Sequence, residues 1–547
     1  MIRILLVYLC MIFNFCFAQS QKSSAEKIAQ LFDFVEEKGP GLSIAVVKNN
    51  EILYGKGIGF ANLEYDIPNT LHSKFDVASV AKQFTAACIW VLTTQGKISL
   101  EDDIRKYLPE FPDYGRQIKI KHLLNHTSGI RCYTYLMDLS GFDGQNNYFD
   151  NQTIFELACQ QEHLNNVPGE KVIYGNTNFN LLTLIIENIT GEKFSVFARK
   201  NIFLPLAMND TFFRDNEKEL VINRAVGYEK TSDNTYHRFP RTQESHGAGS
   251  LWSTVSDLVK WTSLFTNEVA AYKDLVTFLT SSEVLPEGER ASYARGIMLS
   301  DYKGHQTIHH SGFTSGYQSQ VISVPSLKLS VIILTNLEAI NPSPISYQVI
   351  DLFLNNTNSS QPIAAQFTKS LSPKTALQFQ GDYQELHSDL RMRITFKNDS
   401  LQAKTNWATS AISLKQIGTN TFCRAHNQSV SYKFNHKTYD LVVYFGGTPF
   451  YFNMASFIAP DQVIISAYEG NYYSKELKVK YRLFCEGEKL YLSYPNHLKV
   501  PLQSGKKDEF GTGNRVLLHF NRTEMNQINS FTVSSAGVVK DILFQKI

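Results

Sequence analysis

The feature that most constrains the fold is a change in hydrophobic period near residue 355. Before this point, apolar residues recur at both helical and strand spacings, whereas from residue 374 onward almost every stretch alternates with a period of two. Between them, residues 355–373 are rich in Asn, Ser, Gln, Thr and Pro. We therefore predict a mixed domain over residues 19–354, a linker over 355–373 and an all-β region beyond it.

The all-β region contains an internal repeat. Residues 379–386 (FQGDYQEL) match residues 468–475 (YEGNYYSK), and an alternating strand and a hairpin turn follow each copy. Repetition of this kind indicates duplicated structural units. We predict two similar units of antiparallel strands, each a small barrel, over residues 374–458 and 459–547.

The first domain begins and ends with strand signals and has helical patterns between them. Two hairpins are expected, one from residues 41–48 and 51–60 and the other from residues 316–323 and 329–335. Helices are predicted over residues 25–37, 79–94 and 344–353. This order describes an α/β (α+β) domain with an antiparallel sheet closed by its terminal segments.

The first 18 residues have the pattern of a secretory signal peptide. Arg3 precedes an apolar run over residues 4–13, and Ala18 provides a small residue at a cleavage site. The run is short for a membrane anchor, although an uncleaved anchor is the alternative. We predict cleavage, no integral membrane segment afterwards, and a periplasmic or extracellular protein.

Composition excludes some function classes. The 53 Lys and Arg residues nearly balance 51 Asp and Glu residues, and no basic run occurs, so nucleic acid is not an expected partner. Of the seven cysteines, two lie in the leader and five are scattered, which gives no disulfide framework. No His or Cys cluster has metal-ligand spacing, so we expect no metal and no cofactor.

The first candidate for chemistry is a Ser-x-x-Lys pair. The chain has four such pairs, beginning at Ser24, Ser79, Ser300 and Ser504, but only Ser79 opens a strongly apolar helix. At this spacing Ser79 and Lys82 share one helix face. Burial and the helix N-terminus should lower the pKa of Lys82, which could then take the proton of a Ser79 nucleophile. The alternative is a capping serine and a solvated lysine.

Two further stretches could complete a site. Tyr174 and Asn176 lie in a loop before a predicted helix, where neighbouring ammonium groups would lower the pKa of Tyr174 and make it a second base or proton relay. Asn176 could orient Lys82 and a substrate carbonyl. Alternatively, they are an interior aromatic and a capping residue.

The other stretch precedes the second hairpin. His310 could line the edge of the strand, and Gly312 would let a substrate backbone approach closely. The backbone N–H of Phe313 could join that of Ser79 as an oxyanion hole. A solvated loop histidine is the alternative.

Taken together and in this order, these stretches resemble the serine β-lactamase and D,D-peptidase superfamily, in particular its class C β-lactamase and D-aminopeptidase group. The similarity covers residues 41–338 and includes Leu123–Gly129 and Gly247–Leu258. It implies a serine β-lactamase/transpeptidase-like catalytic domain, an acyl-enzyme on Ser79, and proton transfer by Lys82 and Tyr174.

The sequence departs from the β-lactamase pattern at His310, where Lys-Thr-Gly usually supplies a cation for the substrate carboxylate. A histidine is only partly charged at neutral pH. The form His-x-Gly is that of D-aminopeptidase-like enzymes, which also append two β-barrels. We therefore expect a secreted serine hydrolase of a small-molecule or short-peptide substrate, an amide, peptide or ester.

Two alternatives stay open. One is a β-lactamase or D,D-carboxypeptidase, and the other is a non-catalytic protein that binds peptides or the cell wall on the same scaffold. The β units could cap the active-site cleft, bind the cell wall or form contacts in a homodimer.

Overall fold

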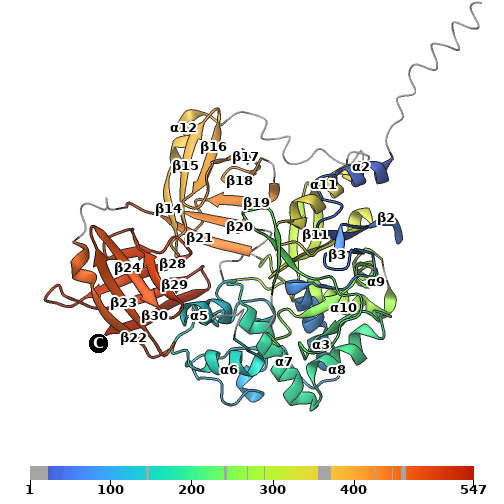
Figure 1. Ribbon diagram of the computed structural model, residues 1–547, viewed down its shortest axis with the longest axis horizontal. Coiled ribbons are helices and arrows are strands. Elements are labelled where there is room, and N and C mark those ends of the chain that lie inside the picture. The colour runs from blue at the N-terminus through green and yellow to red at the C-terminus, as the bar shows by residue number, and fades with distance from the viewer. Residues whose placement is uncertain are drawn as a thin grey trace, which may run out of the picture.

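The computed structural model describes residues 23–142, 147–239, 243–267, 269–286, 288, 290–354, 371–425, 427–445, 448–457 and 464–547. Figure 1 shows an α/β part, coloured blue to yellow, beside two β units, coloured orange and red. The predicted signal peptide (1–18) and the predicted linker up to residue 370 lie outside the described residues.

The α/β part is built on a six-stranded antiparallel sheet. The strand order is β10-β11-β12-β13-β1-β2, so the first strands of the chain pair with the last strand of this part. The predicted closure by terminal segments is therefore confirmed. The strands are β1 (Leu42–Lys48), β2 (Glu51–Ile58), β10 (Met298–Tyr302), β11 (His305–Thr314), β12 (Tyr317–Val324) and β13 (Leu329–Thr335).

Both predicted hairpins of this sheet are present. Asn49 and Asn50 connect β1 to β2 with φ angles of 51° and 72°, which are the positive values that a tight two-residue hairpin turn needs and that Asn tolerates. A short 3₁₀ turn, Pro325–Leu327, connects β12 to β13.

Strand β13 is buried on both faces. Val331 and Ile333 belong to the core shared with α2 (Ser24–Gln30) and α11 (Pro342–Leu354). The alternate residues, Ile332 and Leu334, belong to the larger core on the opposite face. Burial on both faces explains the continuous apolar run of this strand.

The helix predicted over residues 25–37 is shorter than expected. Helix α2 ends at Gln30, and Phe32 and Val35 stay buried in the turns that follow. The other helices of the α/β part are α3 (Ala81–Thr94), α4 (Ile120–Leu124), α5 (Tyr133–Leu139), α6 (Asn151–Cys159), α7 (Asn176–Thr190), α8 (Phe194–Ala198), α9 (Val255–Thr266) and α10 (Lys273–Thr280).

Short elements connect these helices and the sheet. The short strands are β3 (Phe60–Asn62), β4 (Ile67–Pro68), β5 (Phe75–Asp76), β6 (Phe212–Phe213), β7 (Tyr228–Lys230), β8 (Tyr236–Arg238) and β9 (Leu251–Ser253). One 3₁₀ turn, η1 (Ala78–Val80), leads directly into α3.

The first β unit is a closed barrel that follows the short helix α12 (Pro373–Ala376). We call it barrel 1. Its strands, in spatial as well as chain order, are β14 (Gly381–Glu385), β15 (Arg391–Lys397), β16 (Ser400–Thr405), β17 (Ile412–Gln416), β18 (Thr421–Arg424), β19 (Asn427–Phe434), β20 (Leu441–Phe445) and β21 (Thr448–Met454).

The second β unit is a nine-stranded antiparallel sheet that curls into a nearly closed barrel, which we call barrel 2. Its strand order is β25-β24-β23-β22-β30-β29-β28-β27-β26. The strands are β22 (Gly470–Ser474), β23 (Val479–Glu486), β24 (Lys489–Tyr494), β25 (His497–Pro501), β26 (Gln503–Ser504), β27 (Glu509–Gly511), β28 (Val516–Arg522), β29 (Ile528–Ser535) and β30 (Val539–Lys546). The predicted fold class is thus confirmed.

The sequence repeat corresponds to equivalent structure in the two barrels. Tyr383 in β14 donates a hydrogen bond from its hydroxyl to the carbonyl of Phe379, over 2.9 Å. Tyr472 in β22 does the same to the carbonyl of Tyr468, over 3.0 Å. In each barrel this bond ties the first strand to the 3₁₀ turn before it.

Barrel 2 shares its core with the α/β part. Leu136 and Leu139 of α5 belong to the same buried cluster as the inward-facing side chains of barrel 2. The hydroxyl of Tyr481 adds to this contact by donating a hydrogen bond to the carbonyl of Leu139. Among the described residues, no helix is both long enough and apolar enough to cross a bilayer.

Candidate active site

Ser79 lies in a strained turn at the start of α3. The preceding residue, Ala78, has a φ of 48°, and its N–H donates to Asp76 Oδ1 over 2.8 Å. The N–H of Val77 bonds the carbonyl of Leu251 over 2.9 Å. A left-handed alanine persists only where its surroundings hold it, and such residues cluster at functional sites. These bonds hold Ser79 half-buried at the mouth of a cavity.

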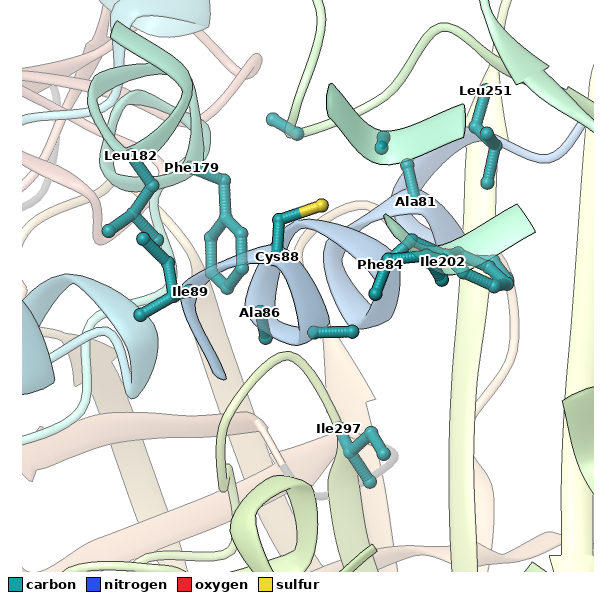
Figure 2. Close-up of a cluster of buried hydrophobic side chains, with 14 of the residues drawn as sticks. Ala81, Phe84, Ala86, Cys88, Ile89, Phe179, Leu182, Ile202, Leu251 and Ile297 are labelled. Atoms are coloured by element: carbon teal, nitrogen blue, oxygen red, sulfur yellow. The ribbon is translucent and has the colours of Figure 1, made fainter. Parts of the chain in front are cut away.

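Helix α3 provides a rigid base for this turn, because it passes through the middle of the larger core. Figure 2 shows the helix surrounded by side chains from several other elements. The residues labelled there are Ala81, Phe84, Ala86, Cys88 and Ile89 of α3, with Phe179, Leu182, Ile202, Leu251 and Ile297 around them.

Lys82 is fully buried one turn after Ser79. Its Nζ lies 3.1 Å from Ser79 Oγ, 2.9 Å from Asn176 Oδ1 and 2.8 Å from the carbonyl oxygen of Ala248. The last two atoms only accept hydrogen bonds, so in the neutral amine they take both N–H groups and direct the lone pair toward Ser79. Burial lowers the pKa of Lys82 to about 7, in the expected direction.

The two acceptors of Lys82 are themselves held in place. Asn176 is the first residue of α7, and its Nδ2 reaches Thr134 Oγ1 at 3.4 Å. Ala248 follows Gly247, whose carbonyl accepts a hydrogen bond of 2.8 Å from Thr85 in α3. The segment that begins at Gly247, noted in the sequence, therefore orients the lysine.

Tyr174 lies against Ser79 and Lys82, but its ionisation differs from our expectation. Lys82 Nζ is 4.9 Å from the centre of its ring, and its phenol shares a hydrogen bond with Ser79. Burial raises the pKa of Tyr174 above its ordinary value, so the predicted lowering is wrong. Loss of water around the phenolate outweighs the hydrogen bond with Ser79, which acts in the opposite direction. The phenol is neutral at pH 7.

Behind Tyr174 lies His126, which sequence reasoning quoted within a motif but did not assign to the site. The two ring centres are 4.3 Å apart. His126 Nδ1 accepts from Asn178 Nδ2 at 3.0 Å and from the N–H of Gly175 at 3.3 Å, so its proton is on Nε2. Burial lowers the pKa of His126 far below its ordinary value. A neutral imidazole therefore supports the tyrosine.

His310 is also neutral and buried. Its Nδ1 donates to the carbonyl of Ser311 over 2.6 Å, which leaves Nε2 to accept from the hydroxyl of Tyr293 over 3.0 Å. Burial, with a smaller contribution from Lys82, lowers the pKa of His310 to about 3. The expected partial charge at neutral pH is therefore wrong, because the ring is removed from water.

Gly312 brings β11 against the turn that holds Ser79. A Cβ at this position would lie 2.3 Å from the carbonyl oxygen of Val77 and 3.0 Å from Ala78 Cβ. The absence of a side chain at Gly312 therefore allows residues 77 and 78 to pack directly against β11. Strand β10 pairs only with residues 305–309, so residues 310–314 form an open edge. The next residue, Phe313, is 61% exposed on this edge.

Six of the seven predicted site residues line the main cavity. The seventh, Lys82, is buried beneath the cavity wall and contacts Ser79. The cavity has a volume of about 620 Å³. Its walls come from the α/β part and from both barrels. The barrel residues are Glu385, His387, Phe445, Thr448, Pro449, Phe450 and Tyr451 of barrel 1 and Arg515, Ala536, Gly537 and Val538 of barrel 2. Sequence reasoning missed these residues, which no local motif marks.

A second pocket of about 260 Å³ shares Ser79, Thr134, Asn176 and Phe313 with the first. Its described lining contains polar and small residues but no charged side chain. Substrate groups on either side of a scissile bond could therefore occupy two different environments. Within the described ranges, no group of three or more His, Cys, Asp or Glu side chains could hold a metal ion.

Several known proteins are similar to this chain in sequence. The family model described as Beta-lactamase matches residues 25–347. Protein flp of Staphylococcus aureus (strain MRSA252) is 28% identical over 332 residues, which cover 58% of this chain and 64% of that protein. Penicillin-binding protein 4* of Bacillus subtilis is 29% identical over 349 residues, 58% of this chain and 73% of that protein. The match therefore spans less than two thirds of Protein flp.

Solved structures share the fold. The octameric penicillin-binding protein homologue from Pyrococcus abyssi has a TM-score of 0.55 and 21% identity, and the match covers 87% of this chain and 98% of that one. The D-amino acid amidase from Ochrobactrum anthropi SV3 has a TM-score of 0.51 and 20% identity over 61% of this chain and 99% of that one.

Proposed function

Because the chain belongs to the beta-lactamase family, we propose that it is a serine hydrolase that forms an acyl-enzyme on Ser79. The observation that carries the proposal is the position of Lys82. A buried amine with a pKa near 7 lies 3.1 Å from Ser79 Oγ, and two fixed acceptors direct its lone pair to that hydroxyl. A retired binding scaffold would not need this arrangement.

In the acylation step, Ser79 Oγ attacks the substrate carbonyl while neutral Lys82 takes its proton. The N–H groups of Ser79 and Phe313 stabilise the oxyanion that forms. Tyr174, as a neutral phenol, donates its proton to the leaving group and takes one back from the protonated Lys82 amine, whose Nζ lies 4.9 Å from the centre of its ring. Water then attacks the ester carbonyl, and the same groups return the proton to Ser79.

Small amides, peptides or esters are the substrates that the site fits best. A neutral His310 supplies no positive charge where β-lactamases and D,D-carboxypeptidases hold the substrate carboxylate. The fold is one on which a D-amino acid amidase is known. We therefore favour a D-aminopeptidase- or esterase-like activity over action on β-lactams or on peptidoglycan peptides.

The setting of the enzyme is also a proposal. The leader of residues 1–18 supports export and cleavage, which would place the enzyme in the periplasm or outside the cell. Of the three roles considered for the barrels, capping the active-site cleft is supported by the eleven barrel residues that line the cavity.

A substrate screen tests the activity. Purified enzyme would be incubated with p-nitroanilides of L- and D-amino acids, with short-chain p-nitrophenyl esters and with nitrocefin. We expect hydrolysis of amides or esters and little or none of nitrocefin. Ser79→Ala should abolish the activity. Equal turnover by the Ser79→Ala variant would refute the proposal, and rapid nitrocefin turnover would restore the β-lactamase alternative.

A further inference from the structure

We propose that Arg515 of barrel 2 binds a carboxylate at the end of the substrate remote from the scissile bond. This inference rests on the proposed function, because it concerns the cavity that contains Ser79. It makes the preferred substrate an acyl or peptidyl compound with an anionic end, recognised by a barrel and not by the strand edge at His310.

Arg515 is exposed in the turn between β27 and β28 and lines the main cavity. Its guanidinium lies 5.2 Å from the centre of the Trp407 ring of barrel 1 and hydrogen-bonds the side chain of Tyr135. Stacking and one hydrogen bond orient this planar group but leave donors available. Within the part of the chain that the structure describes, no carboxylate forms an ion pair with it.

The cavity offers few other charges. Among its described lining residues, Arg515 is the lone Lys or Arg side chain. His310 and His387 are buried, and burial lowers the pKa of each to about 3, so neither carries a charge at pH 7. Arg515 is therefore the permanent positive charge of this cavity.

One acidic residue, Glu385, also lines the cavity, but its own turn satisfies it. It is 3% exposed, and its Oε2 accepts a hydrogen bond of 3.0 Å from the N–H of His387. Ser388 provides a further side-chain hydrogen bond. Because these hydrogen bonds already satisfy the carboxyl group of Glu385, it repels an anion bound at Arg515 only slightly.

The remaining surroundings strengthen an ion pair at Arg515. Much of the cavity wall near the barrels is apolar or aromatic, with Phe445, Phe450 and Tyr451 of barrel 1 and Val538 of barrel 2. A guanidinium beside such a wall pairs with a carboxylate more strongly than one in bulk water. The described lining of the smaller pocket contains no charged side chain, whereas that of the larger pocket contains Arg515, so an anionic group is expected in the larger one.

Matched esters provide the test. The substrates are mono-p-nitrophenyl esters of straight-chain dicarboxylic acids of increasing length, each compared with its neutral methyl ester. We expect the free acid to be preferred by about tenfold in kcat/KM at the chain length that reaches Arg515. Arg515→Gln should remove this preference, so that the free acid and its methyl ester have equal kcat/KM. Arg515→Lys should retain part of it, because a lysine keeps the charge without the planar fork.

Arg482→Gln is the matched control. Arg482 is exposed on β23 of barrel 2, stacks on Phe484 and does not line the cavity, so the same loss of charge there should leave the preference intact. Equal kcat/KM for acid and methyl ester at every length, or a preference that survives Arg515→Gln, would overturn the inference.

Failure of the two proposals can be told apart. If wild-type enzyme hydrolyses methyl esters through Ser79 but shows no acid preference, the carboxylate site alone fails. If neither these esters nor the amides of the substrate screen are hydrolysed, the proposed activity fails, and calorimetric binding of the same ligands to the Ser79→Ala variant decides the carboxylate site. Equal affinity for acid and methyl ester there would overturn the inference.

Discussion

The two barrels begin with the same repeat but join the rest of the molecule differently. Barrel 2 is attached to the α/β part by buried contacts. Arg131 and Glu476 form an ion pair in which the side chains are 1% and 3% exposed, and Asn165 donates to the carbonyl of Val538 over 2.8 Å. Together with the leucines of α5 in its core, these contacts make barrel 2 a fixed part of the wall of the cavity that contains Ser79.

Barrel 1 is held mainly by barrel 2. The N–H of Gly513 donates to Asp389 Oδ2 over 2.6 Å, and Arg391 donates to the carbonyl of Ser504 over 3.0 Å. Toward the α/β part, Lys171 donates to the hydroxyl of Tyr439 over 3.3 Å, and this bond is partly buried. Duplicated units have thus diverged in role, with barrel 2 supporting α5 and barrel 1 supplying an aromatic wall to the cavity.

The largest effect should come from breaking the buried ion pair of barrel 2. Glu476→Ala leaves Arg131 buried without its counter-charge, so we expect a loss of about 3–5 kcal/mol in the free energy of unfolding, measured by denaturant titration. Activity should fall with it, since α5 carries Thr134 next to Asn176.

Lys475→Ala is the neighbouring control. Its ion pair with Glu162 is 2.8 Å long, but the two side chains are 86% and 46% exposed. Such a surface pair contributes about 0–1 kcal/mol. If Glu476→Ala were no more destabilising than Lys475→Ala, barrel 2 would not be anchored as we describe.

The next effect concerns the site that both barrels enclose. Because the pKa of Lys82 is lowered to about 7, the amine is protonated below this pH and cannot act as base. We expect kcat/KM to rise with pH to a plateau and to reach half of the plateau value near pH 7. Well below this midpoint, kcat/KM should fall about tenfold for each pH unit. Changes at the contact of barrel 1 should not move this midpoint. A profile flat down to pH 5 would exclude Lys82 as the base.

The smallest effect should come from the contact of barrel 1. Lys171 lies 5.4 Å from the centre of the Tyr451 ring, which lines the cavity. We expect Lys171→Ala to reduce unfolding free energy by about 1 kcal/mol or less and to raise KM about two- to threefold with kcat unchanged. Lys437→Ala, at an exposed position of the same barrel, is the control and should change neither. A loss of kcat in Lys171→Ala would mean that barrel 1 positions catalytic groups.

The parts of this account that were predictable depend on local pattern. Apolar residues at helical spacing after Ser79 predicted α3, and the two apolar runs over residues 41–48 and 51–60 predicted the first hairpin. Period-two alternation with a repeat predicted the barrels. The contact of Lys82 with Asn176 was expected because the Ser79–Lys82 and Tyr174–Asn176 motifs occur in the order seen in the family that the sequence resembles.

Other features depend on burial and on docking between distant segments, which no local pattern encodes. The pKa of Tyr174 follows from its enclosure by the rings of His126 and Tyr293, and so moves opposite to our expectation. Arg515 reaches the cavity of Ser79 only because barrel 2 packs on α5, more than 350 positions earlier in the chain.

The central claim is that Ser79 is the acylated nucleophile with Lys82 as its base. Labelling with a fluorophosphonate probe, followed by peptide mapping in a mass spectrometer, tests it most directly. The account predicts one adduct, on Ser79, that is absent from Ser79→Ala and forms at least about 100-fold more slowly in Lys82→Met. An adduct on another residue, or equal labelling of wild-type and Ser79→Ala protein, would contradict it.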